Sequence, residues 1–256
     1  MTTICKNCNH NLEGNFCSNC GQSANTHDID FKSIVHELQH SVFHIDKGIL
    51  YTTRELFVRP GHTIREYIFG KRVKHFKPVA YIIVLSTIYA LLTNFTHKTS
   101  FLESALEGMI DSGTENSKNS DYFFVEVLRW MKNHYAYTTL ILIPIISIAS
   151  YSAFYRTKYN YFQHLILNSF IAGQKMIVLL VVLPLVYFIN NERINYSNGI
   201  FTLFMGIFLT FWTYYQFFNT TKPVRKVSLT ILAYTILSIL FFVLIFLLFG
   251  ISKILS

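Results

Sequence analysis

Residues Arg59 to Pro78 read RPGHTIREYIFGKRVKHFKP, and they separate a polar part of the chain from an apolar part. This segment, here called the basic stretch, holds one acid, Glu66, and six cations: Arg59, Arg65, Lys71, Arg72, Lys74 and Lys77. Lysine and arginine resist translocation, so such a run directly before an uncharged apolar segment is typical of the cytoplasmic flank of a first membrane span. The basic stretch therefore predicts a membrane protein whose N-terminal part stays in the cytoplasm.

The composition also indicates a membrane protein. Of the 256 residues, 52% are hydrophobic and 14% are charged, with a mean hydropathy of +0.35, whereas soluble domains carry about 25% charged residues. The formal net charge is +8. Because the cations concentrate beside apolar segments, they predict the lipid bilayer and its anionic headgroups as partners. A nucleic-acid partner is disfavoured, since the sequence carries no RNA-binding or recognition-helix motif.

Five apolar segments follow the basic stretch, at residues 78–95, 135–155, 165–189, 200–218 and 227–252. A bilayer core of about 30 Å takes about 20 helical residues, so each segment is close to or above the length of a span. The connections 156–164 and 219–226, with the basic stretch, hold more lysine and arginine than the outer segments. The sequence therefore predicts an all-α integral membrane protein with about five transmembrane helices, N-in/C-out, and a membrane domain over residues 78–256. Its outer loop, 96–134, is expected to hold two amphipathic helices near 101–110 and 122–131.

The four cysteines lie within the first twenty residues and form two CxxC motifs, Cys5 with Cys8 and Cys17 with Cys20. Each motif brings two thiolates to one tight turn, and two such turns complete a tetrahedral sulfur site. Asn9 and Gly21 follow the motifs and tolerate the left-handed backbone that these turns require. A reducing cytoplasm favours metal over disulfides, and the N-terminus lacks the pattern of a signal peptide. Residues 1–25 are thus predicted to form a small cytoplasmic zinc ribbon with structural Zn²⁺. A redox CxxC or chance is the alternative, and His10 is an alternative ligand.

Residues 26–77, here called the collar, are predicted to form cytoplasmic amphipathic helices that lead into the membrane domain. A first helix runs to about Asp46, and shorter ones cover about 50–58 and 63–69. The two shorter helices are expected to lie at the headgroup level or to pack against the cytoplasmic ends of the spans. The six cations of the basic stretch are candidate lipid-headgroup ligands, with Lys71 and Arg72 foremost.

The first collar helix contains His36-Glu37-Leu38-Gln39-His40, which matches the HExxH signature of zinc peptidases. The histidines share a polar face with His44, no third ligand follows at a recognisable spacing, and the helix lies outside the predicted spans. We therefore favour an ordinary hydrated or partner-facing helix over a metal-binding histidine stripe, and both over a peptidase.

Lys175, next to Gln174, is the exception in spans that hold almost no other ionisable residue. An intramembrane lysine is a candidate functional residue. Its position near the cytoplasmic end of the third segment favours a side chain that snorkels outward. The alternative is contact with an ion, an anion or a substrate.

Several motifs occur in order along the first part of the chain: the paired CxxC motifs with Gly21-Gln22, Arg59-Pro60-Gly61, Ile64-Arg65-Glu66-Tyr67, Gly70-Lys71-Arg72 and Pro78. In this combination, over roughly residues 5 to 95, the chain resembles an uncharacterised bacterial membrane protein family, domain of unknown function 3667. The resemblance implies an N-terminal zinc ribbon, transmembrane helices and the bacterial inner membrane, and it implies no activity. Asn9, where related ribbons often have glycine, is a local departure.

The sequence contains a strong metal-binding motif and no recognisable set of catalytic residues. This combination favours a non-enzymatic interaction or assembly protein. We expect this protein to dock a partner through its cytoplasmic ribbon. A small transporter or channel that uses Lys175 and Gln174 is the alternative. A zinc peptidase that uses His36, Glu37 and His40 is the third interpretation.

Overall fold

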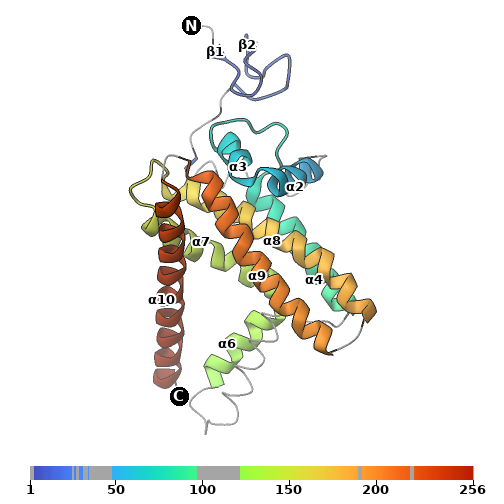
Figure 1. Ribbon diagram of the computed structural model, residues 1–256, viewed down its shortest axis with the longest axis vertical. Coiled ribbons are helices and arrows are strands. Elements are labelled where there is room, and N and C mark those ends of the chain that lie inside the picture. Colours follow the sequence, from blue (N-terminus) through green and yellow to red (C-terminus); the bar gives the residue numbers. More distant parts are fainter. Residues whose placement is uncertain are drawn as a thin grey trace.

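The computed structural model describes residues 3–24, 26, 29–30, 34, 48–96, 122–189, 192–219 and 222–255. The chain begins with a short antiparallel pair, β1 (Thr3–Ile4) and β2 (Asn11–Leu12), in which Thr3 lies opposite Leu12. An isolated bridge joins Phe16 to Ser23. Figure 1 shows this ribbon at one end of the molecule and the C-terminus at the opposite end.

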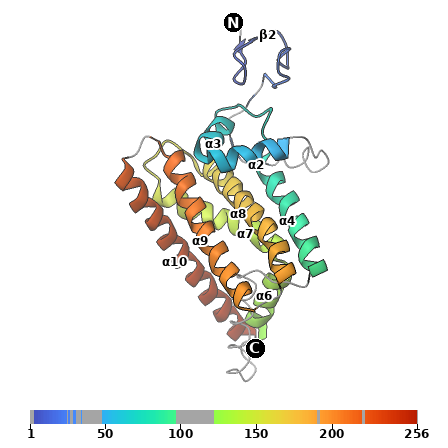
Figure 2. The same ribbon diagram turned by 45° about the vertical axis from the view of Figure 1, so that its right-hand side comes forward.

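The collar helices α2 (Gly48–Val58) and α3 (Pro60–Ile68) lie between the ribbon and the long helices, as both views show (Figures 1 and 2). The helix expected from Thr63 thus begins three residues earlier, at Pro60. Proline suits the first helical position because its φ is already helical and its missing N–H has no intrahelical partner there. Gly70, at a φ of 103°, turns the chain after α3 toward the membrane domain.

Each of the five predicted apolar segments forms a helix. These helices are α4 (Pro78–Thr96), α7 (Tyr135–Ala153), α8 (Tyr161–Ile189), α9 (Glu192–Phe217) and α10 (Pro223–Leu255). Three of them contain stretches long and apolar enough to cross a membrane, namely Tyr161–Leu185, Ser197–Phe217 and Pro223–Leu247. The apolar parts of α4 and α7, Pro78–Thr93 and Tyr137–Ala153, are shorter. The chain is therefore a membrane protein by the length and composition of these helices, and five spans remain a prediction.

Where a helix start differs from the start of the predicted apolar segment, the helix begins earlier in the chain. Three helices, α8, α9 and α10, begin four to eight residues before the segments expected at 165, 200 and 227. Hydropathy marks the part of a helix that matches the bilayer, and polar turns extend beyond it. The amphipathic helix expected near 122–131 is α6 (Tyr122–Asn133), which packs against α7 and α10. The other, near 101–110, lies outside the described residues.

The connections predicted to be cytoplasmic lie beside the collar. The Lys158 ammonium lies 4.9 Å from the ring centroid of Phe69, just after α3. Arg65 of α3 donates to the backbone carbonyls of Gln216 and Phe217 at the end of α9. The connection after α7 and the end of α9 therefore meet the collar, while the C-terminal end of α10 lies far from it (Figure 1). In the predicted topology the connections after α7 and α9 lie on the same side of the membrane as the collar, and the C-terminus lies on the other side. The arrangement agrees with this, and the orientation in the membrane stays a prediction.

Candidate functional site

The four cysteines converge on one point. Their Sγ atoms all lie within 4.8 Å of one another, with Cys5 and Cys20 3.6 Å apart and Cys8 and Cys17 3.5 Å apart. Tetrahedral coordination with metal–sulfur bonds of about 2.3 Å places sulfur atoms about 3.8 Å apart. The four sulfurs therefore fit a single metal ion, and they come from two turns twelve residues apart, each flanked by its own antiparallel pairing.

Two equivalent turns hold these sulfurs. The Asn9 N–H donates to the Cys5 carbonyl and the Gly21 N–H to the Cys17 carbonyl, both at 2.9 Å. Asn9 has a φ of 61° and Gly21 a φ of 73°, so the left-handed backbone expected at these two positions is confirmed. His10 accepts the Cys5 N–H through its carbonyl, and its ring is not part of the four-atom cluster.

The protein environment gives the thiols of Cys17 and Cys20 different pKa values. Hydrogen bonds from the Asn7 side chain and the Gln22 backbone lower the pKa of Cys20 to about 6. Burial raises the pKa of Cys17 to about 11. A metal binds thiolates and not thiols, so ion binding releases protons and weakens as the pH falls.

The ribbon contacts the collar at the turn after α3. The buried Gln22 side chain accepts the Arg72 backbone N–H through Oε1 at 3.2 Å. Gly70 leaves room for Lys6, because a Cβ at position 70 would lie 2.8 Å from Lys6 Cδ. These contacts join Gln22 and the Gly70–Arg72 turn, which the sequence analysis lists as separate motifs.

Replacement of Gln22 by alanine is expected to loosen the ribbon from the collar without loss of the metal. The substitution leaves the Arg72 N–H without its acceptor and costs about 1 kcal/mol. Hydrogen exchange at the Arg72 amide should accelerate by about fivefold, while the metal content per chain stays unchanged. Ser18→Ala, at an exposed ribbon position, is the matched control. Equal Arg72 exchange in the two variants would contradict the contact.

Ion pairs and hydrogen bonds within the protein engage four of the six cations of the basic stretch. Arg59 pairs with Glu55 and Glu66, and Lys71 donates to Glu66 at 3.1 Å. Burial opposes ionisation of Glu66, but the Lys71 hydrogen bond and the nearby cations outweigh burial and lower its pKa. Arg65 is held by the end of α9, as described above. These side chains therefore stabilise the conformation of the collar in addition to giving it positive charge.

The two remaining lysines of the basic stretch differ from the others. Lys74 is exposed and Lys77 half-buried, and neither side chain has a hydrogen bond or ion pair with a described residue. Arg72, by contrast, donates through Nε to the Tyr67 carbonyl and stacks on the Tyr67 ring. Lipid-headgroup contact stays a prediction for all six cations, and the contacts favour Lys74 and Lys77 over the expected Lys71 and Arg72.

Gln174 connects three helices. Its side chain is fully buried, and Nε2 donates to the Leu56 carbonyl of α2 at 2.8 Å. Its Oε1 accepts a hydrogen bond from the Thr213 hydroxyl of α9 at 3.3 Å. Both the nitrogen and the oxygen of the Gln174 amide therefore form hydrogen bonds at the junction between the collar and the membrane domain.

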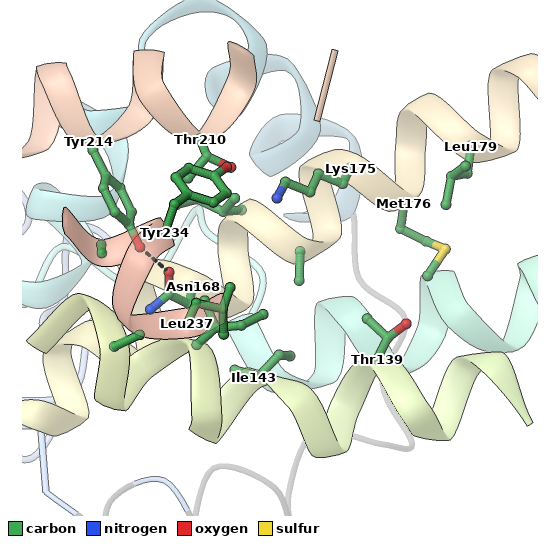
Figure 3. A pocket seen from close by; sticks show the side chains of 15 residues that line it. Thr139, Ile143, Asn168, Lys175, Met176, Leu179, Thr210, Tyr214, Tyr234 and Leu237 are labelled. Carbon is green, nitrogen blue, oxygen red and sulfur yellow. Dashed lines mark hydrogen bonds between the residues drawn. The ribbon is translucent and has the colours of Figure 1, made fainter. Parts of the chain in front are cut away.

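Lys175 points elsewhere, into a cavity of about 150 Å³ between α7, α8, α9 and α10 (Figure 3). Its stem lies against Gly206 of α9, where an added Cβ would be 3.7 Å from Lys175 Cδ and Cε. The polar residues that line the cavity are Thr139, Asn168, Lys175, Thr210, Tyr214 and Tyr234. Contact between Lys175 and a ligand stays a prediction, and Gln174 is not part of this cavity.

A buried polar network that the sequence analysis missed adjoins the cavity. The Tyr214 hydroxyl donates to Asn168 Oδ1 at 2.7 Å, and Asn168 Nδ2 donates to the Ser150 hydroxyl at 2.9 Å. That hydroxyl lies 3.0 Å from His164 Nδ1. The signal in the sequence was polar spacing, since His164 and Asn168 lie one helical turn apart. The network joins α7, α8 and α9 by hydrogen bonds within their apolar surroundings.

The predicted peptidase signature and histidine stripe, His36, Glu37, His40 and His44, lie outside the described residues.

The sequence model of the family described as "Protein of unknown function (DUF3667)" matches residues 46–90. This match confirms the predicted resemblance over α2, α3, the basic stretch and most of α4. The cysteine motifs lie outside the matched segment. No curated protein and no solved structure matches the chain.

Proposed function

We propose, starting from the match of residues 46–90 to the DUF3667 family, that this chain is a multi-pass protein of the bacterial inner membrane. We propose that it binds a protein partner through a cytoplasmic zinc ribbon and that its role is interaction or assembly rather than catalysis. The family resemblance supports the location, and the distribution of lysine and arginine supports the orientation.

The donor set supports zinc as the metal. Four thiolates are soft ligands, and tetrahedral sulfur coordination is typical of zinc or of iron–sulfur centres. A site with four protein ligands leaves no open position for water or substrate, which suits a structural ion and not a catalytic one. The ion would then fix the shape of a module that projects from the collar.

Two exposed apolar side chains on the ribbon carry the docking proposal. Ile4 is 61% exposed and Phe16 is 68% exposed. Ile4 directly precedes Cys5 and Phe16 directly precedes Cys17, so the metal-binding turns hold both side chains in place. Large apolar anchors on a rigid module are the kind of residue that dominates the affinity of protein interfaces.

The test replaces both anchors, as Ile4→Ser with Phe16→Ser, in the full chain. Chemical crosslinking in intact membranes followed by quantitative mass spectrometry should show partner recovery reduced by about tenfold or more, because buried apolar anchors each contribute at least about 1 kcal/mol. Val58→Ser, on α2 and 62% exposed, is the control and should leave recovery unchanged. An unchanged partner set in the double variant, with its metal content intact, would count against docking through the ribbon.

A small transporter or channel is a second candidate, and the cavity beside Lys175 is the observation that favours it. Reconstituted protein should then carry a flux that Lys175→Ala abolishes. Gln174→Ala should instead act through stability, because the Gln174 amide bonds to Leu56 and Thr213.

A further inference from the structure

We infer that the cavity between α7, α8, α9 and α10 binds an acidic amphiphile, a single carboxylate on an apolar chain, with Lys175 as its counter-charge. This inference goes beyond partner docking at the ribbon, and it holds whether or not the ligand is transported.

The charge of Lys175 is the first argument. Its ammonium has no hydrogen bond or ion pair with any described residue, and the cavity lining contains no aspartate or glutamate. A cation among apolar helices without a partner is costly, and the cost falls when an anion binds next to it. Because Lys175 is the single charged residue among the described residues of the lining, a monoanion balances it and a dianion leaves excess negative charge.

The hydroxyl groups of the cavity are the second argument. Tyr214 already donates to Asn168, and Thr210 donates to the Gly206 carbonyl at 2.9 Å. The Tyr234 hydroxyl of α10 is buried beside the Thr210 side chain, and no described group forms a hydrogen bond of normal geometry with it. A buried hydroxyl is normally satisfied by a well-formed hydrogen bond, so the Tyr234 hydroxyl is able to donate to a stronger acceptor such as a carboxylate. In Figure 3 the Lys175 ammonium lies on the side of the cavity that faces Thr210 and Tyr234.

Carboxylate oxygens fit both groups, since one accepts from the ammonium while the other accepts from the Tyr234 hydroxyl. Hydrogen bonds with a charged partner are shorter and stronger than neutral ones. Lys175 and Tyr234 stand on different helices, α8 and α10, so a bound carboxylate would bridge them.

The remaining wall suits an apolar chain. Apart from the polar groups, the lining consists of aliphatic side chains and methionine: Ile143, Ile146, Ala149, Ile171, Ala172, Met176, Leu179, Ala233 and Leu237. A volume of about 150 Å³ equals that of a cavity that holds one benzene molecule, so it accepts the headgroup and the first few carbons. Leu179 and Leu237 are half-exposed, and α10 continues beyond them with Ile239 and Phe242 exposed by 57% and 69%. A longer tail therefore has an apolar path toward the lipid.

The binding test uses the full chain in phosphatidylcholine nanodiscs with radiolabelled oleate as the probe. We expect saturable binding that unlabelled oleate displaces, and that neither oleyl alcohol nor acetate displaces at the same concentration. Lys175→Met, which keeps the length of the side chain, should weaken binding by about tenfold or more, and Lys175→Arg should restore much of it. Tyr234→Phe should weaken binding by about three- to tenfold.

Lys222→Met removes an exposed lysine before α10 and is the control, with binding unchanged. If Lys175→Met fails to fold, Tyr234→Phe and the competition by oleyl alcohol still decide the matter. Equal displacement by oleyl alcohol and oleate would overturn the role of the charge. Stronger displacement by lysophosphatidic acid than by oleate would overturn the carboxylate assignment in favour of a phosphate. Ribbon variants should bind oleate normally, so this test and the docking test fail independently.

Discussion

Removal of the metal is expected to unfold the ribbon and to leave the membrane helices in place. The described part of residues 1–25 buries few side chains, chiefly Cys5, Cys17 and Gln22. So small a module cannot form a hydrophobic core that outweighs its loss of conformational entropy. Metal coordination then supplies most of the folding free energy, on the order of 10 kcal/mol or more in structural zinc modules.

The measurement compares hydrogen exchange of the full chain before and after treatment with a strong zinc chelator. Amides of residues 3–24 should lose their protection by several orders of magnitude, while those of α8 and α9 keep theirs. Cys5→Ser with Cys20→Ser should reproduce the effect without chelator, and Ser18→Ala should behave as the unaltered protein. Acidification should also release the metal, because protons compete for the thiolates. A ribbon that stays protected after elemental analysis shows the metal gone would overturn the metal-dependent fold.

The ribbon and the long helices were predictable because their signals are local. Two CxxC motifs with Asn9 and Gly21 specify a pair of tight turns with no information from the rest of the chain, and both left-handed residues are confirmed. Uncharged apolar stretches likewise specify helices through their length alone. The errors at the starts of α8, α9 and α10 have the same origin, because hydropathy does not record polar turns outside the bilayer.

The candidate site within the membrane was less predictable because it depends on direction around a helix. Gln174 and Lys175 are adjacent in sequence, but neighbouring residues on a helix lie about 100° apart and do not face the same partner. Gln174 therefore contacts Leu56 and Thr213, while Lys175 lines the cavity. Their separation depends on which helices surround α8, and the order of the apolar segments does not determine this.

The basic stretch shows a second limit. Its cations indicate a membrane flank by their number, yet the sequence does not show which of them has its partners in a distant part of the chain. Arg65 contacts carbonyl groups about 150 residues later, at Gln216 and Phe217. Charge counting treats each arginine as available to lipid, and only the tertiary contacts show which ones hold the collar to the membrane domain.

The contact between α3 and α9 also gives the largest expected effect of a single methyl group. Gly61 of α3 lies against the backbone of the last turn of α9. A Cβ at position 61 would overlap the Phe217 nitrogen and would lie 2.5 Å from the Gln216 carbonyl carbon. Backbone atoms cannot rotate away as a side chain does, and the bonds from Arg65 hold the same carbonyl groups. Gly61→Ala should therefore separate α3 from α9.

Gly61→Ala is expected to lower the free energy of unfolding by about 1–3 kcal/mol or more, as at other overpacked sites. Helix propensity alone predicts the opposite sign, because alanine is favoured over glycine within helices by about 1 kcal/mol. A destabilised variant would therefore report the clash with α9. Gly14→Ala is the control, since no atom of the described residues lies within 4 Å of a Cβ at that position. Thermal unfolding of the detergent-solubilised chain should show a lower midpoint for Gly61→Ala and an unchanged one for Gly14→Ala. A midpoint equal to or above that of the unaltered protein would mean that helix propensity outweighs the clash, and that α3 does not lie this close to α9.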